Sequence, residues 1–202
     1  MSDANETFDL IVVGAGPAGS ELAEAVARAG HSVALLEEHY QVSLPDHCSG
    51  LVSPRTLAAV GIDEEKVALA RYDRARIWGP QGGQVWVRST QVQAVAIDRP
   101  QLDQTLAARA VDAGAMLMLG TRARQFERSH WPGGVRVEVE GADGGQRQWL
   151  RARMLVGAEG AGSGVARWIG ARGGCETIAA DKAVIAFDGG GTETIEIFVG
   201  RQ

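Results

Sequence analysis

The fold of this chain is decided by the stretch Phe8-Asp9-Leu10-Ile11-Val12-Val13-Gly14-Ala15-Gly16-Pro17-Ala18-Gly19. The apolar run at residues 8–13 predicts a strand that is buried on both faces of a parallel sheet. A helical pattern follows the glycines and stops at Gly30, and a second strand is expected over residues 32–36. This order of elements predicts a βαβ unit with a glycine-rich first turn.

The residues of this turn have separate physical tasks in a dinucleotide site. Gly14 allows a turn that a side chain would obstruct, Gly16 lets the backbone approach a pyrophosphate, and Gly19 lets the helix pack closely on the strand. Pro17 loses no useful hydrogen bond at a helix start, and the remaining amides face the anion together with the helix dipole. The predicted pyrophosphate site is Gly14, Gly16, Pro17, Ala18 and Gly19.

An acidic pair, Glu37-Glu38, closes the second strand. The spacing from Gly14 to Glu37 is close to the roughly 20 residues of the dinucleotide fingerprint, so Glu37 is expected to accept hydrogen bonds from the adenosine ribose, with Glu38 beside it. A carboxylate here repels a 2′-phosphate, which favours FAD or NAD over NADP. The alternative is a plain tight turn with a solvated Glu37, and the complete fingerprint favours the dinucleotide site.

The composition argues against several classes of protein. The chain has 202 residues, 45% of them hydrophobic, and a formal net charge of −5. This length allows one substantial core, or one domain plus part of another. No basic block is present, so nucleic-acid binding is not expected. Cys48 and Cys175 lie far apart and outside any CxxC spacing, so neither a disulfide framework nor a metal site is predicted.

The N-terminus predicts where the protein resides. Residues 1–6 lack the basic start and apolar core of a signal peptide. No apolar run approaches the roughly 20 residues that span a bilayer. We therefore expect a soluble, cytoplasmic protein, and attachment to a membrane surface stays open.

The remaining chain alternates between helical and strand patterns. Helices are expected over residues 54–60, 99–112 and 165–169, a hairpin over 76–78 and 84–88, and strands over 92–97, 116–119, 136–139, 149–156, 183–187 and 194–199. The predicted class is α/β, with a parallel Rossmann-like sheet interrupted by antiparallel β pieces. The predicted domains are a discontinuous cofactor-binding domain (1–60 and 94–172) and a partial substrate domain (61–93 and 173–202).

Four segments of the chain resemble geranylgeranyl reductases, which are FAD-dependent enzymes among the para-hydroxybenzoate hydroxylase-like flavoproteins. They are Pro45-Asp46-His47-Cys48-Ser49-Gly50-Leu51-Val52-Ser53, the DRxxxD-like residues 97–103, the GADGxxS-like residues 156–163 and the strand at 195–200. The resemblance covers essentially the whole chain. It implies FAD as cofactor and the reduction of isolated C=C bonds in isoprenoid groups by hydride from the reduced flavin.

Two departures from the family pattern stand out. Glu159 replaces the usual Asp of the second glycine motif, which lengthens that side chain by one methylene. Family members also continue, beyond the part matched here, with a PxxYxWxFP-like segment and a later glycine-aspartate motif. We therefore expect the chain to be the N-terminal part of a longer enzyme.

The resemblance also implies further cofactor ligands. It places Arg99 against the ribityl-pyrophosphate region of the flavin, and the alternative is a surface ion pair with a neighbouring aspartate. It places Ala158, Glu159 and Gly160 in a turn beside the pyrophosphate. The alternative there is an ordinary strand-to-helix turn with Ser163 as the helix N-cap, and both roles can coexist.

Two residues of the loop at 45–53 are candidates for catalysis. The resemblance implies that this loop passes beside the isoalloxazine ring, so Cys48 could orient the alkene and His47 could supply a proton. The alternatives are that Cys48 is a small buried apolar residue and that His47 is simply exposed.

The resemblance leaves the partners and two rival functions open. Electrons are expected from NAD(P)H or ferredoxin, and the isoprenoid substrates imply peripheral membrane contact. One rival function is a flavin monooxygenase of the hydroxylase type, which would activate oxygen. The other is an inactive, truncated flavoprotein that cannot close its cofactor site.

Overall fold

The chain forms two compact units, each assembled from two separate segments. The computed structural model describes residues 7–128, 134–171, 178–185 and 194–200. One unit consists of Met1–Pro45 with Asp103–Ala179, and the other of Asp46–Leu102 with Ala180–Gln202. Their edges differ from the predicted domains, since residues 46–60 and 94–102 lie in the second unit. Which unit holds the cofactor and which the substrate stays a prediction.

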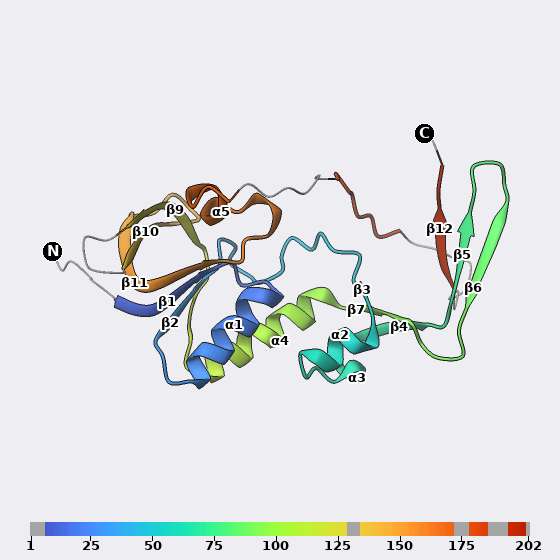
Figure 1. Cartoon of the computed structure of the whole chain (residues 1–202), viewed down its shortest axis with the longest axis horizontal. Helices are drawn as coiled ribbons and strands as arrows, with labels where there is room; N and C mark the ends of the chain where they lie inside the picture. The colour runs from blue at the N-terminus through green and yellow to red at the C-terminus, as the bar shows by residue number, and fades with distance from the viewer. Residues whose placement is uncertain (1–6, 129–133, 172–177, 186–193, 201–202) are drawn as a thin grey trace. The chain divides into compact units, whose positions relative to one another are not determined.

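The first unit is built on a six-stranded sheet of order β8-β2-β1-β11-β10-β9 (Figure 1). The central strand, β1 (Thr7–Val13), runs parallel to β2 (Val33–Leu36) and to β11 (Gln148–Gly157). β8 (Met116–Met118) extends the parallel part beyond β2. The predicted α/β class with a parallel sheet is thus confirmed.

β11 belongs to both parts of this sheet. Its first half pairs antiparallel with β10 (Val135–Gly141), which in turn pairs with β9 (Thr121–Arg128). Its second half runs parallel to β1, and Ala152 has partners on both sides. The antiparallel strands are therefore continuous with the parallel ones.

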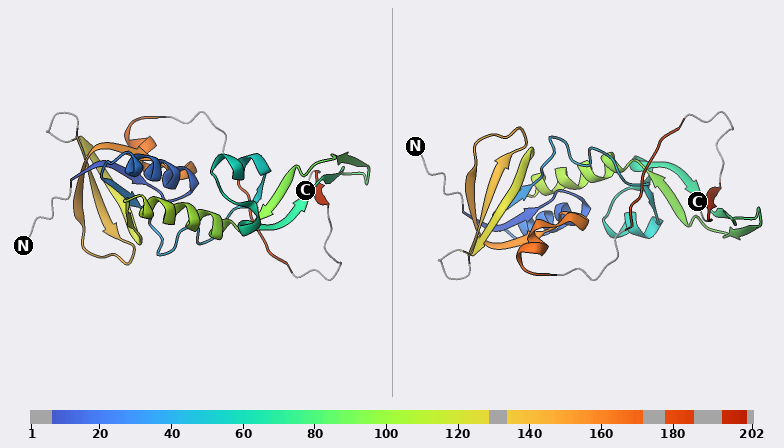
Figure 2. Two further views of the ribbon diagram at one scale, coloured as in Figure 1. Left: turned by 90° about the horizontal axis from the view of Figure 1, so that it is seen from below. Right: turned by 90° about the horizontal axis from the view of Figure 1, so that it is seen from above.

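Apolar layers cover both faces of the first unit's sheet. On one face, α1 (Pro17–Arg28) and α4 (Arg99–Asp112) lie side by side (Figure 2). Their alanines pack against Leu10, Val12, Val33 and Leu35 of the strands. On the other face, Ile11 and Leu36 pack against side chains of β10, β11 and α5 (Gly164–Trp168). Two cores thus fix the position of the turn between β1 and α1.

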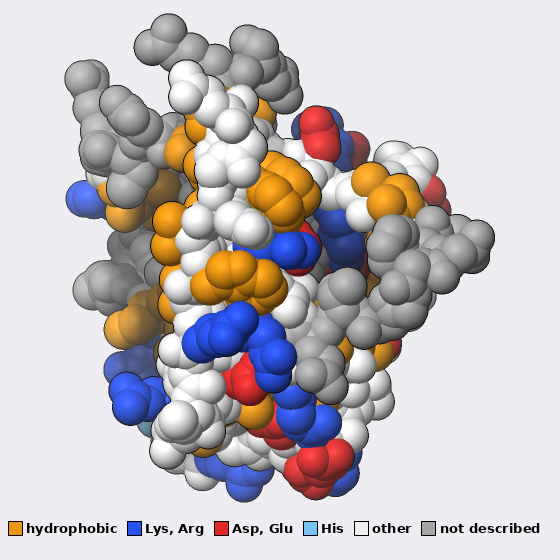
Figure 3. Space-filling view, turned by 90° about the vertical axis from the view of Figure 1, so that its right-hand side faces the viewer, with side chains coloured by type: hydrophobic (Ala, Val, Ile, Leu, Met, Phe, Trp, Pro, Cys, Tyr) orange, Lys and Arg blue, Asp and Glu red, His pale blue; other side chains and the backbone are white. Residues whose placement is uncertain are grey.

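The second unit contains two small sheets, of order β3-β7-β4 and β12-β5-β6. Their strands are β3 (Leu51–Val52), β4 (Ala68–Tyr72), β5 (Arg74–Trp78), β6 (Gln84–Arg88), β7 (Ala94–Ile97) and β12 (Ile195–Phe198), and the helices are α2 (Pro54–Ala59) and α3 (Glu64–Val67). The predicted β5–β6 hairpin is confirmed. Arg76 joins β5 to β12 through Glu196 and lies over the rings of Trp78 and Trp86. Basic and apolar side chains also adjoin one another on the side seen in Figure 3.

Most predicted elements are present within one or two residues of their expected ends. The strand predicted over residues 183–187 is wrong for its described part, because residues 183–185 form no strand, and residues 186 and 187 lie outside the described residues. Cys175 is also outside them. Strands β3, β4 and β9 and helix α3 were not predicted. Among the described residues, no helix has the length and apolar character to cross a membrane, and no cluster of metal-ligand side chains occurs.

Candidate cofactor site

Two glycines of the first turn are required by the packing of the chain itself. Gly14 has φ +102°, a conformation that side chains rarely adopt, and a Cβ there would lie 2.6 Å from the carbonyl oxygen of Ala158. A Cβ on Gly19 would collide with the carbonyl oxygen of Gly14. These two positions bring β1, α1 and the turn after β11 into close backbone contact.

Gly16 differs, because nothing in the chain explains why it is a glycine. Its backbone is ordinary (φ −68°, ψ −179°), and a Cβ there would meet no atom within 4 Å. It is the N-cap of α1, a helix with no side-chain cap and no acidic residue in its first turn. The positive end of this helix thus adjoins the open space at Gly16. This geometry fits a pyrophosphate.

Glu37 is buried beside the glycine turn. Its side chain is 11% exposed, its Oε2 accepts from the Ala15 amide at 3.1 Å, and its Oε1 accepts from the His39 amide at 3.0 Å. The imidazole Nδ1 of His39 lies 2.7 Å from the same Oε1. A carboxylate has about four acceptor positions, so these contacts leave room for a hydroxyl donor. Glu37 is therefore buried and not solvated, and its contact with the ribose stays a prediction.

Glu38 contacts different residues from Glu37, near the surface. Its Oε2 lies 2.6 Å from Nε of Arg122, and both side chains are nearly half exposed. Its Oε1 is 4.0 Å from Nε2 of His39. Glu38 is thus an ion-paired surface residue next to Glu37.

The second glycine turn lies against the first one. The amide of Ala158 donates to the Val13 carbonyl at 2.7 Å, which sets Ala158 beside Gly14. Gly160 has φ +75°, which permits the tight turn that follows. Within the first unit, the structure therefore brings together the predicted residues of both glycine motifs and Glu37.

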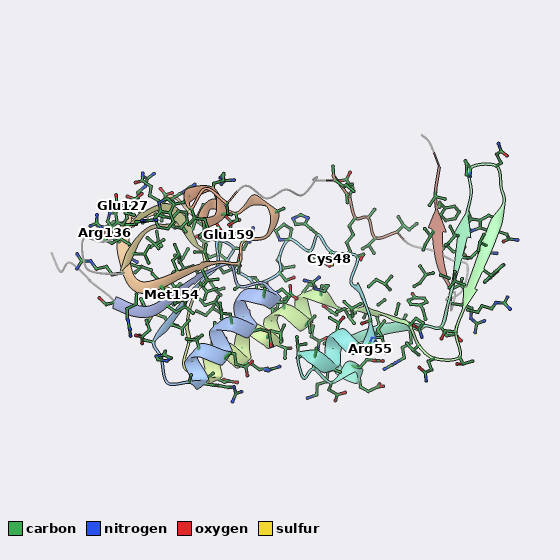
Figure 4. The ribbon with its side chains drawn as sticks, in the orientation of Figure 1. Cys48, Arg55, Glu127, Arg136, Met154 and Glu159 are labelled. Atoms are coloured by element: carbon green, nitrogen blue, oxygen red, sulfur yellow. The ribbon has the colours of Figure 1, made fainter. Side chains whose placement is uncertain are left out.

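The carboxylate of Glu159 binds the start of α5 (Figure 4). It accepts from the Ser163 hydroxyl at 2.6 Å, from the Gly164 amide at 3.0 Å and from the Val165 amide at 3.1 Å. Ser163 is the N-cap, and its hydroxyl also accepts from the Ala166 amide at 3.0 Å. The extra methylene of Glu159 thus directs its carboxylate into hydrogen bonds with its own chain.

The remaining predicted site residues lie in the second unit. Figure 4 shows Cys48 in the loop between β2 and β3. Its thiol is half-buried and free, and its amide donates to Asp46 at 3.1 Å. His47 is exposed. Arg99, the first residue of α4, passes close to Gly50. A hydrogen bond from the Lys182 ammonium outweighs burial and holds the pKa of Asp46 below its usual range, with smaller contributions from the Cys48 amide and then the Arg99 charge.

A family comparison matches this geometry. Residues 7–194 fit the family described as FAD binding domain. The chain belongs to this family of FAD-binding domains. FAD is therefore its cofactor, and the predicted FAD-binding fold is confirmed.

Similar proteins are both reductases and hydroxylases. This FAD-binding domain is 38% identical over 156 residues to digeranylgeranylglycerophospholipid reductase 1 of Methanopyrus kandleri, covering 75% of this chain and 39% of that relative. A geranylgeranyl bacteriochlorophyll reductase-like protein from Thermoplasma acidophilum has a TM-score of 0.73 at 27% identity, over 83% of this chain and 43% of that one. Aklavinone-11 hydroxylase, solved with FAD and aklavinone, has a TM-score of 0.62 at 26% identity, over 84% and 36% of the chains. The chain spans about two fifths of the reductases that it matches.

Two of the contacts that were not predicted from the sequence adjoin predicted site residues. One is the bond from His39 to Glu37, and the other is the ion pair between Asp46 and Lys182. The first had a signal, because His39 follows the acid by two residues. The second joins residues far apart in the sequence, and no local pattern indicates it.

Proposed function

We propose that the protein takes part in an FAD-dependent oxidoreductase reaction that reduces isolated C=C bonds of geranylgeranyl or other isoprenoid groups. The observation that carries cofactor binding is the open space over Gly16 at the uncapped start of α1, next to the buried carboxylate of Glu37. The isoprenoid substrate is supported by the 38% identity to a digeranylgeranylglycerophospholipid reductase. Such a substrate has no carbonyl to polarise, so binding and orientation are the main tasks of the protein.

Each group of residues has a proposed role toward the cofactor. Gly16 and the first amides of α1 bind the pyrophosphate, and Glu37 binds the adenosine ribose. The turn at 158–160 flanks the pyrophosphate through its backbone, because the Glu159 carboxylate is engaged with α5. From the resemblance, Arg99 binds the ribityl-pyrophosphate region. When bound, FAD supplies the hydride chemistry.

The loop with Cys48 is proposed to orient the substrate. The half-buried thiol of Cys48 offers a small, weakly polar contact for an alkene, and the exposed imidazole of His47 can relay a proton. NAD(P)H or ferredoxin is the proposed electron source, and peripheral membrane contact is proposed because the substrates are lipids. Reduction at the wild-type rate by Cys48→Ala, with Cys48→Ser as the matched control, would remove the thiol from this role.

Two measurements, made one after the other, test the proposal: flavin uptake and then alkene reduction. The purified chain is incubated with FAD, freed of excess flavin by gel filtration, and examined by visible absorbance. Dithionite-reduced samples then receive geranylgeranyl diphosphate, and mass spectrometry follows the gain of H2 per double bond. Stoichiometric flavin with this mass gain supports the proposal. Bound flavin without any mass gain contradicts the reductase role of this chain, and a folded chain without flavin contradicts the cofactor site.

The likeness to aklavinone-11 hydroxylase favours a second candidate, a flavin monooxygenase. This reaction consumes oxygen and incorporates it into an aromatic substrate, whereas alkene reduction proceeds without oxygen. NADPH oxidation and oxygen uptake that increase together on addition of an aromatic polyketide would favour the hydroxylase. NADPH oxidation that increases on addition of geranylgeranyl diphosphate under nitrogen would favour the reductase.

A further inference from the structure

The carboxylate of Glu37 is held by the chain before any ligand arrives. Its oxygens accept from two backbone amides, Ala15 at 3.1 Å and His39 at 3.0 Å. The imidazole Nδ1 of His39 adds a side-chain contact at 2.7 Å. Both contacts from His39 reach Oε1, so this residue fixes the rotation of the carboxylate about its last bond and leaves the other oxygen to Ala15.

The chemistry of the contact requires a proton on Nδ1. A carboxylate only accepts, so the imidazole donates either as the neutral Nδ1–H form or as the imidazolium. In both forms the donor lowers the energy of the buried anion, and a hydrogen bond to an ionised group is stronger than one between neutral groups. The contact therefore holds the Glu37 carboxylate in one orientation.

The surroundings of His39 explain why its ring turns toward Glu37. The side chain is 47% exposed, with Nδ1 on Glu37 and Nε2 4.0 Å from the Glu38 carboxylate. Glu38 is paired with Arg122 at 2.6 Å. Glu37 is the more buried acid, at 11% exposed, so it gains more from a direct donor.

We propose that His39 is a positioning residue for the adenosine ribose of the cofactor. It holds the Glu37 carboxylate in the orientation that accepts the ribose hydroxyls. The role rests on the proposed function of Glu37 as the ribose ligand. His39 itself need not touch the cofactor.

Amide side chains provide matched variants for the two ring nitrogens. The amide nitrogen of asparagine occupies nearly the position of Nδ1, and that of glutamine nearly the position of Nε2. FAD titrations of the whole chain should show that His39→Ala weakens binding about tenfold, the worth of one hydrogen bond to a charged group. His39→Asn should restore most of the affinity and His39→Gln little of it. Damage to the fold alone would not distinguish the two amides.

Ligands without ribose hydroxyls provide the second control. ADP and 2′,3′-dideoxyADP share the adenine and the pyrophosphate but differ in the groups that Glu37 is proposed to bind. Isothermal titration should show that His39→Ala weakens the binding of ADP and leaves the affinity for dideoxyADP unchanged. In a Glu37→Gln background, His39→Ala should have almost no further effect on FAD, because the two residues act through one contact.

The outcomes separate the role of His39 from the cofactor site. Loss of FAD affinity in Glu37→Gln without any loss in His39→Ala would overturn the role of His39 alone. Unchanged FAD affinity in Glu37→Gln would contradict the ribose contact and, with it, the role of His39, whereas FAD binding and the reductase proposal would stand. Equal weakening of ADP and dideoxyADP by His39→Ala would also overturn the positioning role.

Discussion

Gly16→Ala and Gly19→Ala should separate cofactor binding from folding at the scale of single residues. A methyl group on Gly16 meets no atom of the chain, so the free energy of unfolding should change by no more than about 0.5 kcal/mol. FAD affinity should fall strongly, because the methyl group occupies the space of the pyrophosphate. Gly19→Ala places its methyl group on the Gly14 carbonyl and should cost about 1–3 kcal/mol. Urea unfolding and FAD titration measure the two effects, and wild-type FAD affinity in Gly16→Ala would contradict the site.

Single residues also mark how far the sequence could predict the site. The glycines and Glu37 could be assigned because their tasks depend on backbone geometry and on spacing along one βαβ unit. The hydrogen bonds of His39 and Glu159 could not be assigned from the sequence, because they depend on side-chain rotamers and on which amides a turn leaves open. The ion pair of Lys182 with Asp46 could not be assigned either, because it joins two segments that are far apart in the sequence.

At the scale of elements, the start of α5 provides a test of the role of Glu159. The Gly164 and Val165 amides donate to different oxygens of Glu159. Glu159→Gln replaces one of these oxygens by an NH2 group, which cannot accept, so one of the two hydrogen bonds is lost. The free energy of unfolding should fall by about 1–2 kcal/mol. Ser163→Ala removes the N-cap of the same helix and should cost about 1 kcal/mol. Thermal unfolding and FAD titration should show lost stability with nearly unchanged FAD affinity in both variants. A loss of FAD affinity in Glu159→Gln alone would mean that the carboxylate contacts the cofactor.

The contact between α1 and α4 should be sensitive to pH. Burial raises the pKa of Glu24, but hydrogen bonds from Arg28 and Arg109 outweigh it, and the pKa lies below its ordinary value of 4.5. A carboxyl with a lowered pKa contributes stability above its unfolded value and loses it as the pH falls through its folded value. Glu24→Gln should therefore cost about 1–3 kcal/mol at pH 7, and the cost should shrink below about pH 4.5. Urea unfolding across this range measures it, and a cost that persists in acid would point to packing instead.

The elements themselves were largely predictable, and the exceptions have physical reasons. β2 is apolar and buried along its whole length, β1 is buried along most of its own, and their pattern is unmistakable. β9 was missed because most of its residues are polar or charged, although Phe126 packs on the core. The second unit has short strands in two small sheets, and such strands depend more on their neighbours than on their own pattern.

At the scale of the whole molecule, FAD should stabilise the two units unequally. The proposed contacts of Gly16 and Glu37 lie in the first unit, and Arg99 lies in the second. A ligand at 100 times its Kd adds about 2.7 kcal/mol to the state that binds it. Hydrogen exchange followed by mass spectrometry should therefore slow in peptides from residues 14–37 and 157–165. Peptides from the β5–β6 hairpin should exchange as before. Equal protection of the β5–β6 hairpin would contradict a cofactor site that does not include this hairpin.

The place of β1 in the sheet has a consequence for how the protein is made. β1 lies between β2 and β11 in the sheet. β2 is near β1 in the sequence, whereas β11 follows more than a hundred residues later. On the ribosome, β2 emerges soon after β1, whereas β11 is complete only when residue 157 has been added. Until then, Ile11 and Val13 lack the side chains of β10 and β11 that bury them in the finished protein. Throughout this interval, the nascent chain therefore presents an open, apolar strand edge to the chaperones that attend it.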